Sequence, residues 1–329
     1  MHAAFSGLSS GKCRHFKEAI TIKTSAQITY SEPFTRKSVK RLTYNDSFWA
    51  FLFLSPNLIG FLAFIFLPVL ASLGLSFVQW DLLSEIKWIG LGNYKELSSD
   101  PIFWKVMWNT VYYTLGTVPT GIIISLALAI ALNQKLKGVK LFRAVYFLPV
   151  ISSTVAVGMI WQWLYNPEFG LVNYLLSLIG IPGPSWLTST SWAMPAVILT
   201  SIWKGLGFNM LLFLAGLQGI PESYYEAAEI DGAGWWAKFR NVTLPLLSPT
   251  TFFVVVMSII NSFQVFDQIF VMTQGGPARC TSVLVHYLYQ NAFEYFKMGY
   301  ASAIAYVLFF IVFVLTMIQL RYSKSWVVY

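Results

Sequence analysis

The chain has 329 residues, of which 56% are hydrophobic and only 11% are charged, and its formal net charge at pH 7 is +8. Soluble globular proteins carry about twice that share of charged residues, so the composition excludes this class and indicates a polytopic membrane protein. The positive charge does not indicate nucleic-acid binding, because the basic residues lie in the tail and in loops beside apolar segments, where membrane topology already requires them.

Residues 1–47 are polar, rich in Ser, Thr, Lys and Arg, and contain no apolar run of signal-peptide length. We expect a disordered cytoplasmic tail. Within it, the run from Gly7 to Cys13 resembles a phosphate-binding loop, but it has too few residues between its glycines and a cysteine where Ser or Thr would hold magnesium. We therefore expect no ATP site in this chain.

Six apolar segments follow, each near the roughly 20 residues that a helix needs to cross a bilayer. They are 51–77, 110–132, 144–165, 193–217, 250–271 and 298–320. Spanning segments must be helical here, because lipid offers no partner to unpaired backbone groups and the segments are too long and too uniformly apolar for barrel strands. The sequence predicts an all-α membrane protein with a six-helix domain over 48–329, with bends near the span prolines Pro68, Pro119, Pro149 and Pro195.

Lys and Arg are concentrated on one side of the predicted spans. The N-terminal tail, the loop 133–143, the segment 218–246 and the C-terminal end share this side and hold most of the basic residues. Because positive residues are retained in the cytoplasm, we expect both termini and the segment 218–246 to be cytoplasmic.

The segment 218–246, between the fourth and fifth spans, contains Glu226-Ala227-Ala228, then three residues, then Gly232. Proline at 221 suits a helix start and Gly232 suits a stop, which predicts a short helix of roughly nine residues with a hinge after it. Three glutamates of this helix, at 222, 226 and 229, share one face, and this face favours a basic or dipolar partner.

Two ionisable residues lie inside predicted spans, Lys204 in the fourth and Asp267 in the fifth. Intramembrane charges are costly and indicate a functional or cavity-facing position. We expect the two to pair or to line a wet cavity. Polar groups around them suit the hydroxyl groups of a solute, although such groups also serve as contacts between helices. These candidate pathway residues are Ser201, Lys204, Gly205, Phe208, Asn209, Asn261, Ser262, Gln264 and Asp267.

The loop pattern (Glu-Ala-Ala, three residues, Gly, nine residues, an aliphatic residue, one residue, Leu-Pro) resembles the cytoplasmic loop of inner-membrane permeases of ATP-driven importers. Segments 203–210, 213–221 and 272–277 and the pairs at 93–94 and 186–187 resemble the carbohydrate branch of that family, which includes maltose, lactose and glycerol-3-phosphate permeases. The resemblance covers about 48–320 and departs at Val242, where the pattern usually has Ile.

This resemblance implies a MetI-like permease of a binding-protein-dependent ABC importer in the bacterial inner membrane. It implies a second permease subunit, two ATP-binding subunits that hold the ATP and magnesium, an extracytoplasmic solute-binding protein, and a sugar or polyol as the solute. It places the solute pocket on the fourth and fifth spans. The residues that it assigns to ATPase coupling are Glu226, Ala227, Ala228, Asp231, Gly232, Leu244 and Pro245.

Three other functions stay open on the sequence. A glycerol-3-phosphate-type permease would use Lys204 to bind phosphate, and an ion-coupled secondary transporter would use Lys204 and Asp267 as its coupling site. An intramembrane enzyme would need an acidic pair or a metal site, and the sequence contains no visible catalytic or metal-binding set. We therefore expect a transporter rather than an enzyme.

Overall fold

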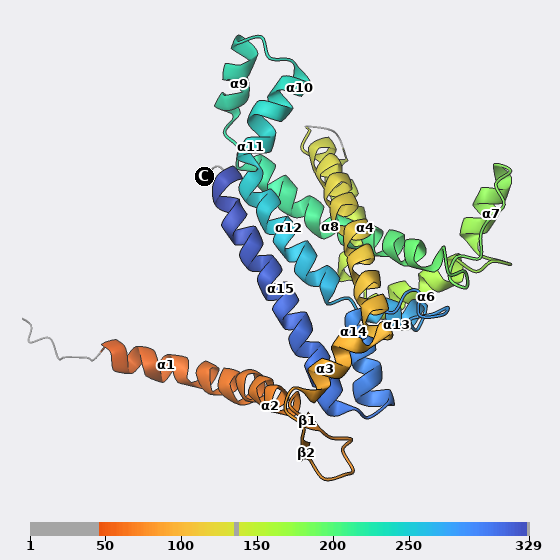
Figure 1. Cartoon of the computed structure of the whole chain (residues 1–329). Coiled ribbons are helices and arrows are strands. Elements are labelled where there is room, and N and C mark those ends of the chain that lie inside the picture. The colour runs from red at the N-terminus through yellow and green to blue at the C-terminus, as the bar shows by residue number, and fades with distance from the viewer. Residues whose placement is uncertain (1–45, 135–137, 328–329) are drawn as a thin grey trace, which may run out of the picture. The chain divides into compact units, whose positions relative to one another are not determined.

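The computed structural model describes residues 46–134 and 138–327 (Figure 1). The predicted tail lies outside the described residues except for its last two positions, Asp46 and Ser47, which begin helix α1. The phosphate-loop-like run and the basic residues Lys135 and Lys137 also lie outside them. The chain divides into two compact units, 1–62 and 63–329.

The described part is mostly helical. In the first unit, α1 spans Asp46–Phe61, and a π-helical turn, Leu62–Phe66, crosses the boundary between the units. The first half of the second unit contains α2 (Leu67–Leu75), β1 (Val78–Gln79), β2 (Lys87–Trp88), α3 (Gly92–Ser99), α4 (Pro101–Leu132), α5 (Val139–Ile151), α6 (Thr154–Leu164), α7 (Leu171–Leu178) and α8 (Ala193–Gln218). The second half contains α9 (Glu222–Ile230), α10 (Trp235–Lys238), α11 (Leu244–Leu246), α12 (Ser248–Phe263), α13 (Asp267–Met272), α14 (Leu284–Tyr289) and α15 (Met298–Trp326), with π-helical turns at Phe239–Thr243 and Gln290–Glu294.

Four helical runs of the described chain are long and apolar enough to cross a membrane as single helices. They are Trp49–Leu75, Pro101–Leu132, Ala193–Gln218 and Met298–Ser325, and they contain most or all of the predicted first, second, fourth and sixth spans. Two bent helix pairs raise the number of spans to six if each pair is one span: Val139–Ile151 with Thr154–Leu164, bent by 101°, and Trp235–Leu246 with Ser248–Phe263, bent by 65°. The predicted fold class, an all-α polytopic bundle, is confirmed.

The predicted third and fifth spans are broken rather than continuous. The third bends by 101° between α5 and α6, where Ser152 is extended, three residues after Pro149. A bend near this proline was predicted, since proline removes a backbone donor from the helix. The predicted fifth span ends as α12 at Phe263 and resumes as α13 at Asp267. The break between α12 and α13 lies beside a polar cavity, where backbone groups are not surrounded by lipid.

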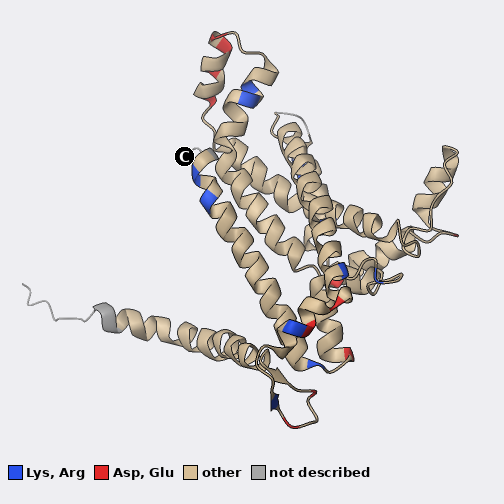
Figure 2. Ribbon diagram, in the orientation of Figure 1, with Lys and Arg blue, Asp and Glu red and all other residues tan. Residues whose placement is uncertain are grey.

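Helix α4 organises the core of the second unit. It packs against α8, α12 and α14, and it contributes Tyr113, Val106 and Ala129 to three separate apolar clusters along its length. Long central stretches of α4, α12 and α15 carry no charged side chain (Figure 2), as expected for segments within a bilayer.

The pair at 93–94, which the resemblance singled out, has a structural role. The buried Asn93 side chain donates to the carbonyls of Ser76 and Val78, at 2.8 and 2.9 Å, and Tyr94 donates to the Ser76 hydroxyl at 2.9 Å. These contacts hold α3 against the start of the β1–β2 hairpin, in which Val78 pairs with Trp88. Asn93 thereby satisfies two carbonyls that would otherwise be buried without a partner.

Asp100, directly after α3, joins the start of α4 to α14 and α15. Its carboxylate caps α4 by accepting from the backbone N–H of Ile102, at 2.8 Å, and it also accepts from the hydroxyls of Tyr287 on α14 and Tyr300 on α15, at 2.6 and 2.7 Å. Burial alone would raise the pKa of Asp100, but these hydrogen bonds outweigh it and hold the pKa below its ordinary value of 3.8. Burial and the bond to Asp100 raise the pKa of Tyr287 to about 12, so this tyrosine remains a donor at neutral pH.

We predict that Asp100→Ala lowers the free energy of unfolding by about 2 kcal/mol, because it removes hydrogen bonds to a charged acceptor. The folded-state pKa of Asp100 lies below the unfolded-state value, so its stabilisation is present above about pH 4 and is lost as the pH falls through the folded-state pKa. Thermal unfolding of the purified protein between about pH 3 and 6 should therefore depend more steeply on pH in the wild type than in the variant. The control is Glu96→Ala, since Glu96 is exposed and lies 3.8 Å from Lys297; an equal loss in both variants would contradict the prediction.

Candidate functional site

A cavity of about 500 Å³ lies where α8, the α12–α13 break and the α5–α6 break meet. A smaller cavity of about 190 Å³ adjoins it and shares several of its wall residues. The two cavities together are lined by every candidate pathway residue, namely Ser201, Lys204, Gly205, Phe208, Asn209, Asn261, Ser262, Gln264 and Asp267. Residues that the sequence places on two separate spans therefore meet at one site.

A chain of hydrogen bonds orients one wall of this site. Tyr113 of α4 donates to the Ser201 hydroxyl at 2.8 Å, and Ser201 donates to Oε1 of Gln268 at 2.7 Å. Gln268 is only 5% exposed, and its Nε2 has no partner among the described residues. A buried amide donor without a partner costs free energy.

Lys204 and Asp267 line the larger cavity together, but no ion pair of the described residues joins them. Of the two predicted alternatives, the structure shows the shared cavity and not the pair. The prediction of a pair assumed a continuous fifth helix, whereas the break after Phe263 makes Asp267 the first residue of a separate helix.

Other candidate residues differ in what their side chains do. Ser262 is buried and donates to Thr114 at 3.0 Å, so its hydroxyl joins two helices. Phe208 is 45% exposed and lines both cavities. Phe266, which lines the larger cavity, packs against Phe270 and Tyr289 with ring centroids 5.3 and 5.1 Å apart.

The structure also adds wall residues that sequence reasoning did not select. Tyr113, Thr117 and Gly121 of α4 line the smaller cavity, and Thr154 lines the larger one at the start of α6. The first three recur every four residues and therefore lie on one helical face. This stripe of small and polar residues in an otherwise apolar span could have identified these wall residues from the sequence.

The segment 218–246 projects from the long helices of the second unit as α9 and α10 (Figure 1). Helix α9 has the predicted nine residues, and it ends before Gly232, whose φ of +77° is in the left-handed region that favours glycine. Of the predicted coupling residues, Glu226, Ala227, Asp231 and Gly232 are exposed on α9 and its turn, and Ala228 is half-buried. Leu244 and Pro245 lie apart from them in α11, which leads into α12.

Two side-chain contacts hold α9 against the returning chain. Lys238 of α10 forms an ion pair with Glu229 at 2.6 Å, and the Tyr225 hydroxyl lies 3.1 Å from that of Thr243. The acidic face predicted for α9 is therefore partly neutralised within the chain, leaving Glu222 and Glu226 without an ion pair among the described residues.

We predict that Lys238→Met speeds hydrogen exchange of the α9 amides by about two- to fivefold, because an exposed ion pair contributes up to about 1 kcal/mol. Arg240→Met is the control, since Arg240 is exposed and has no ion pair in the described part of the chain. Exchanging the charges, Glu229→Lys with Lys238→Glu, should restore the slower rate. Equal exchange rates in the Lys238 and Arg240 variants would contradict the role of this pair.

The turn between α9 and α10 exposes large apolar side chains. Ile230, Trp235 and Trp236 are 87%, 66% and 62% exposed. Exposed apolar residues next to acidic ones are typical of a surface that binds another protein.

Comparison with known proteins identifies the family. A family model described as the binding-protein-dependent transport system inner membrane component matches residues 119–324. The chain is 40% identical to YesP, a probable ABC transporter permease protein of Bacillus subtilis, over 86% of this chain and 93% of YesP. It is 37% identical to AraP, the arabinooligosaccharides transport system permease protein of the same organism, over 86% of this chain and 91% of AraP.

A solved structure has the same fold. It is that of a bacterial ABC transporter involved in the import of the acidic polysaccharide alginate, which matches with a TM-score of 0.75 and 26% identity over 85% of this chain and 96% of that chain. The predicted family and the predicted permease fold are confirmed. The chain therefore belongs to the family of binding-protein-dependent transport system inner membrane components, and it is a multi-pass permease subunit with a role in the translocation pathway.

Proposed function

We propose that this chain forms one half of a pathway that imports a sugar or a related polyol, driven by ATP hydrolysis in partner subunits. The observation that carries the proposal is the polar cavity within the predicted spans. Asn261, Gln264 and Asp267 are exposed there in the single chain. Lipid cannot solvate such groups, so a second permease subunit covers this face and completes the pathway.

The projection formed by α9 and α10 suits two-state coupling to an ATPase. Its acidic and apolar residues are exposed, and Gly232 sets the turn between its helices. In this proposal Glu226, Ala227, Ala228, Asp231 and Gly232 contact an ATP-binding subunit, while Leu244 and Pro245 carry the movement into α12. Two ATP-binding subunits hold the ATP and magnesium, and an extracytoplasmic binding protein delivers the solute.

The distribution of basic residues supports an orientation with both termini in the cytoplasm. Arg143 donates to the carbonyl of Leu132 at the end of α4, Lys238 lies in α10 beside α9, and Arg321 lies near the end of α15. We propose that the protein lies in the bacterial inner membrane with α9 and α10 on the cytoplasmic side.

The lining of the larger cavity favours a neutral solute over a phosphate ester. It contains one cation, Lys204, one anion, Asp267, and no arginine, whereas phosphate is usually held by several basic groups. The unpartnered amide of Gln268 and the amides of Asn261 and Gln264 suit hydroxyl groups. Relatives named for arabinooligosaccharide and lactose transport support a saccharide.

Affinity purification of the tagged chain from its native membrane tests the proposal. We expect an ATP-binding subunit and a second permease subunit to co-purify. Glu226→Lys should remove the ATP-binding subunit and retain the second permease, whereas Glu85→Lys, a charge reversal at an exposed residue between β1 and β2, should retain both. Purification of the chain without an ATP-binding subunit under conditions that preserve the membrane complex would contradict the proposal.

A further inference from the structure

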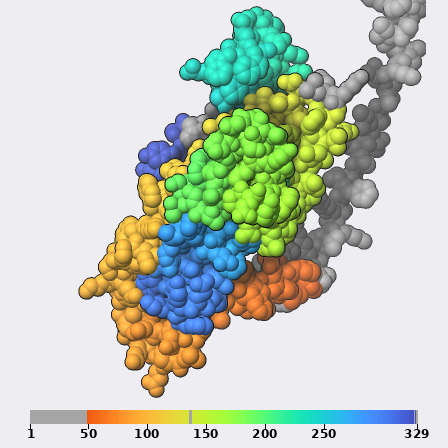
Figure 3. All heavy atoms as spheres, turned by 90° about the vertical axis from the view of Figure 1, so that its right-hand side faces the viewer, coloured from red at the N-terminus to blue at the C-terminus, as the bar shows by residue number. Residues whose placement is uncertain are grey.

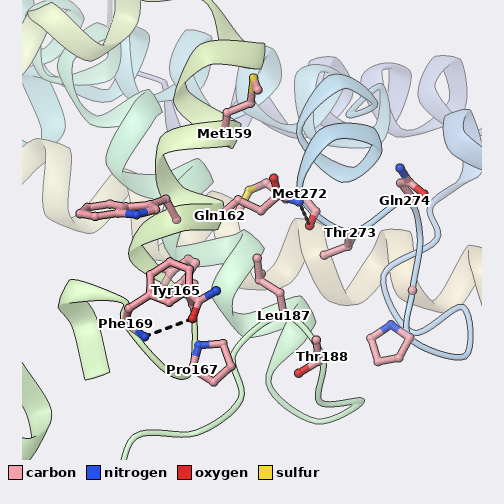
Figure 4. Close-up of a pocket in the computed structure, with 14 residues that line it drawn as sticks. Met159, Gln162, Tyr165, Pro167, Phe169, Leu187, Thr188, Met272, Thr273 and Gln274 are labelled. Carbon is pink, nitrogen blue, oxygen red and sulfur yellow. Dashed lines mark hydrogen bonds between the residues drawn. The ribbon is translucent and has the colours of Figure 1, made fainter. Parts of the chain in front are cut away.

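A separate pocket of about 700 Å³, which we call the second pocket, lies between α6, the segment that follows α13, and the loop before α8. Figure 4 shows Gln162 of α6, Tyr165 directly after α6, Thr273 and Gln274 after α13, and Thr188 from the loop before α8. In Figure 3, the green segment that contains α7 borders the blue segment that follows α12 on this face. None of the candidate pathway residues lines this pocket.

Two adjacent helices run from this pocket to the larger cavity that Lys204 and Asp267 line, which we call the inner cavity. Helix α6 begins at Thr154 on the wall of the inner cavity and ends next to Tyr165 in the second pocket. Helix α13 likewise begins at Asp267 in the inner cavity and ends at Met272 in the second pocket. At a rise of 1.5 Å per residue, the two sites are about 8–16 Å apart along these helices.

The helices are tightly joined between the two sites. A side-chain carbon at Gly158 of α6 would lie 3.0 Å from Val271 of α13, which leaves little room between them. The distance between the two sites is therefore set by packed helices rather than by a free loop.

The lining of the second pocket has the chemistry of a site for a neutral polar ligand. It contains aromatic rings, amides and hydroxyls, and no charged side chain. Trp163 and Phe169 are 56% and 62% exposed, so their rings are available to an incoming ligand. A saccharide combines apolar C–H faces, which pack on such rings, with hydroxyls that need amide partners. A phosphate or carboxylate would find no cation among the lining residues.

Two of the amides are held in place with one end free. Gln162 donates from Nε2 to the carbonyls of Val271 and Met272, both at 3.3 Å, and its Oε1 has no partner among the described residues. Asn166 accepts at Oδ1 from the N–H groups of the next turn, at 2.9 and 3.2 Å, and its Nδ2 likewise has none. The pocket thus presents one fixed acceptor and one fixed donor, an arrangement that lowers the entropy cost of binding.

We propose that this second pocket is an outer subsite for a neutral saccharide unit, which holds the trailing part of a chain-like solute while its leading unit occupies the inner cavity. The inference rests on the proposed transport of a saccharide and adds to it a second binding site and a preference for oligomers. In the proposed orientation the pocket lies on the extracytoplasmic side of the pathway.

Saturation-transfer NMR on the purified full chain in lipid nanodiscs tests the subsite without ATP or partner subunits. The probes are four neutral trisaccharides (maltotriose, cellotriose, xylotriose and mannotriose) and one acidic one, trigalacturonic acid. We expect transfer to at least one neutral trisaccharide and at least threefold less transfer to the acidic one. Gln274→Ala combined with Thr188→Val should reduce the neutral signal at least threefold.

A matched control separates the loss of the second pocket from a general effect on folding. Thr190→Val changes an exposed threonine two residues away that does not line the pocket, and it should leave the signal unchanged. A signal that survives the double variant, or no transfer to any neutral trisaccharide, overturns the subsite. Failure of ATP-driven uptake is measured separately and would overturn the proposed function instead.

Discussion

Replacing Gly232 with serine should reduce ATP-driven uptake about tenfold while the chain still inserts and assembles with its partner permease. Gly232 has a φ of +77°, and a side chain in the left-handed region costs about 1–2 kcal/mol. No atom lies within 4 Å of the position that a Cβ would occupy, so the effect comes from the backbone and not from a clash. A free-energy cost of this size lowers the population of the native turn by about five- to thirtyfold.

Gly234→Ser is the matched control for this experiment. Gly234 is two residues away, has equally open surroundings, and has a φ of −69° as the N-cap of α10, where serine is a favoured residue. We expect this variant to transport at the wild-type rate. If the two variants transported equally, the conformation of the turn would not matter for coupling.

Replacing Gly207 with alanine should lower the free energy of unfolding by about 3 kcal/mol, because it inserts a methyl group into a closed helix contact. The new Cβ would meet the carbonyl oxygen of Tyr146 in α5 at an impossible distance and would lie 2.9 Å from the Cα of Phe147. Both are backbone atoms, so α5 and α8 would have to separate. Because α8 carries Lys204 and Ser201 of the inner cavity, this separation should also impair transport.

Gly205→Ala provides the comparison on the same helix. A Cβ at Gly205 would meet nothing within 4 Å, and alanine favours the helical state, so the stability of this variant should equal or exceed that of the wild type. Thermal unfolding of both variants in the same detergent measures the difference. A Gly207→Ala protein as stable as Gly205→Ala would contradict the close contact between α5 and α8.

The sequence was most informative where a single physical property decides the structure. Apolar length predicted the four single-helix spans, and the glycine at 232 predicted the end of α9 within two residues. The candidate pathway residues met in adjoining cavities because polar side chains within spans must avoid lipid.

The sequence did not predict features that depend on the direction of the backbone or on contacts between residues far apart in the chain. The break between Phe263 and Asp267 contains neither proline nor glycine, and it separates Asp267 from the pairing expected with Lys204. Lys238 lies nine residues from Glu229, on the other side of the turn after α9. The spacing of the glutamates within one helix could not predict a contact across that turn. Tyr113 lies within an apolar span, and its role in the cavity wall comes from its hydrogen bond to Ser201, 88 residues later.

Uptake into proteoliposomes tests the central claim most directly. The vesicles contain this chain, its partner permease and the ATP-binding subunits, and the solute is the one carried by the purified binding protein of the system. We predict uptake only when ATP is present on the side that carries α9 and α10 and the binding protein is present on the opposite side. Uptake at the same rate by the two permeases alone, driven by an ion gradient without ATP-binding subunits, would contradict it.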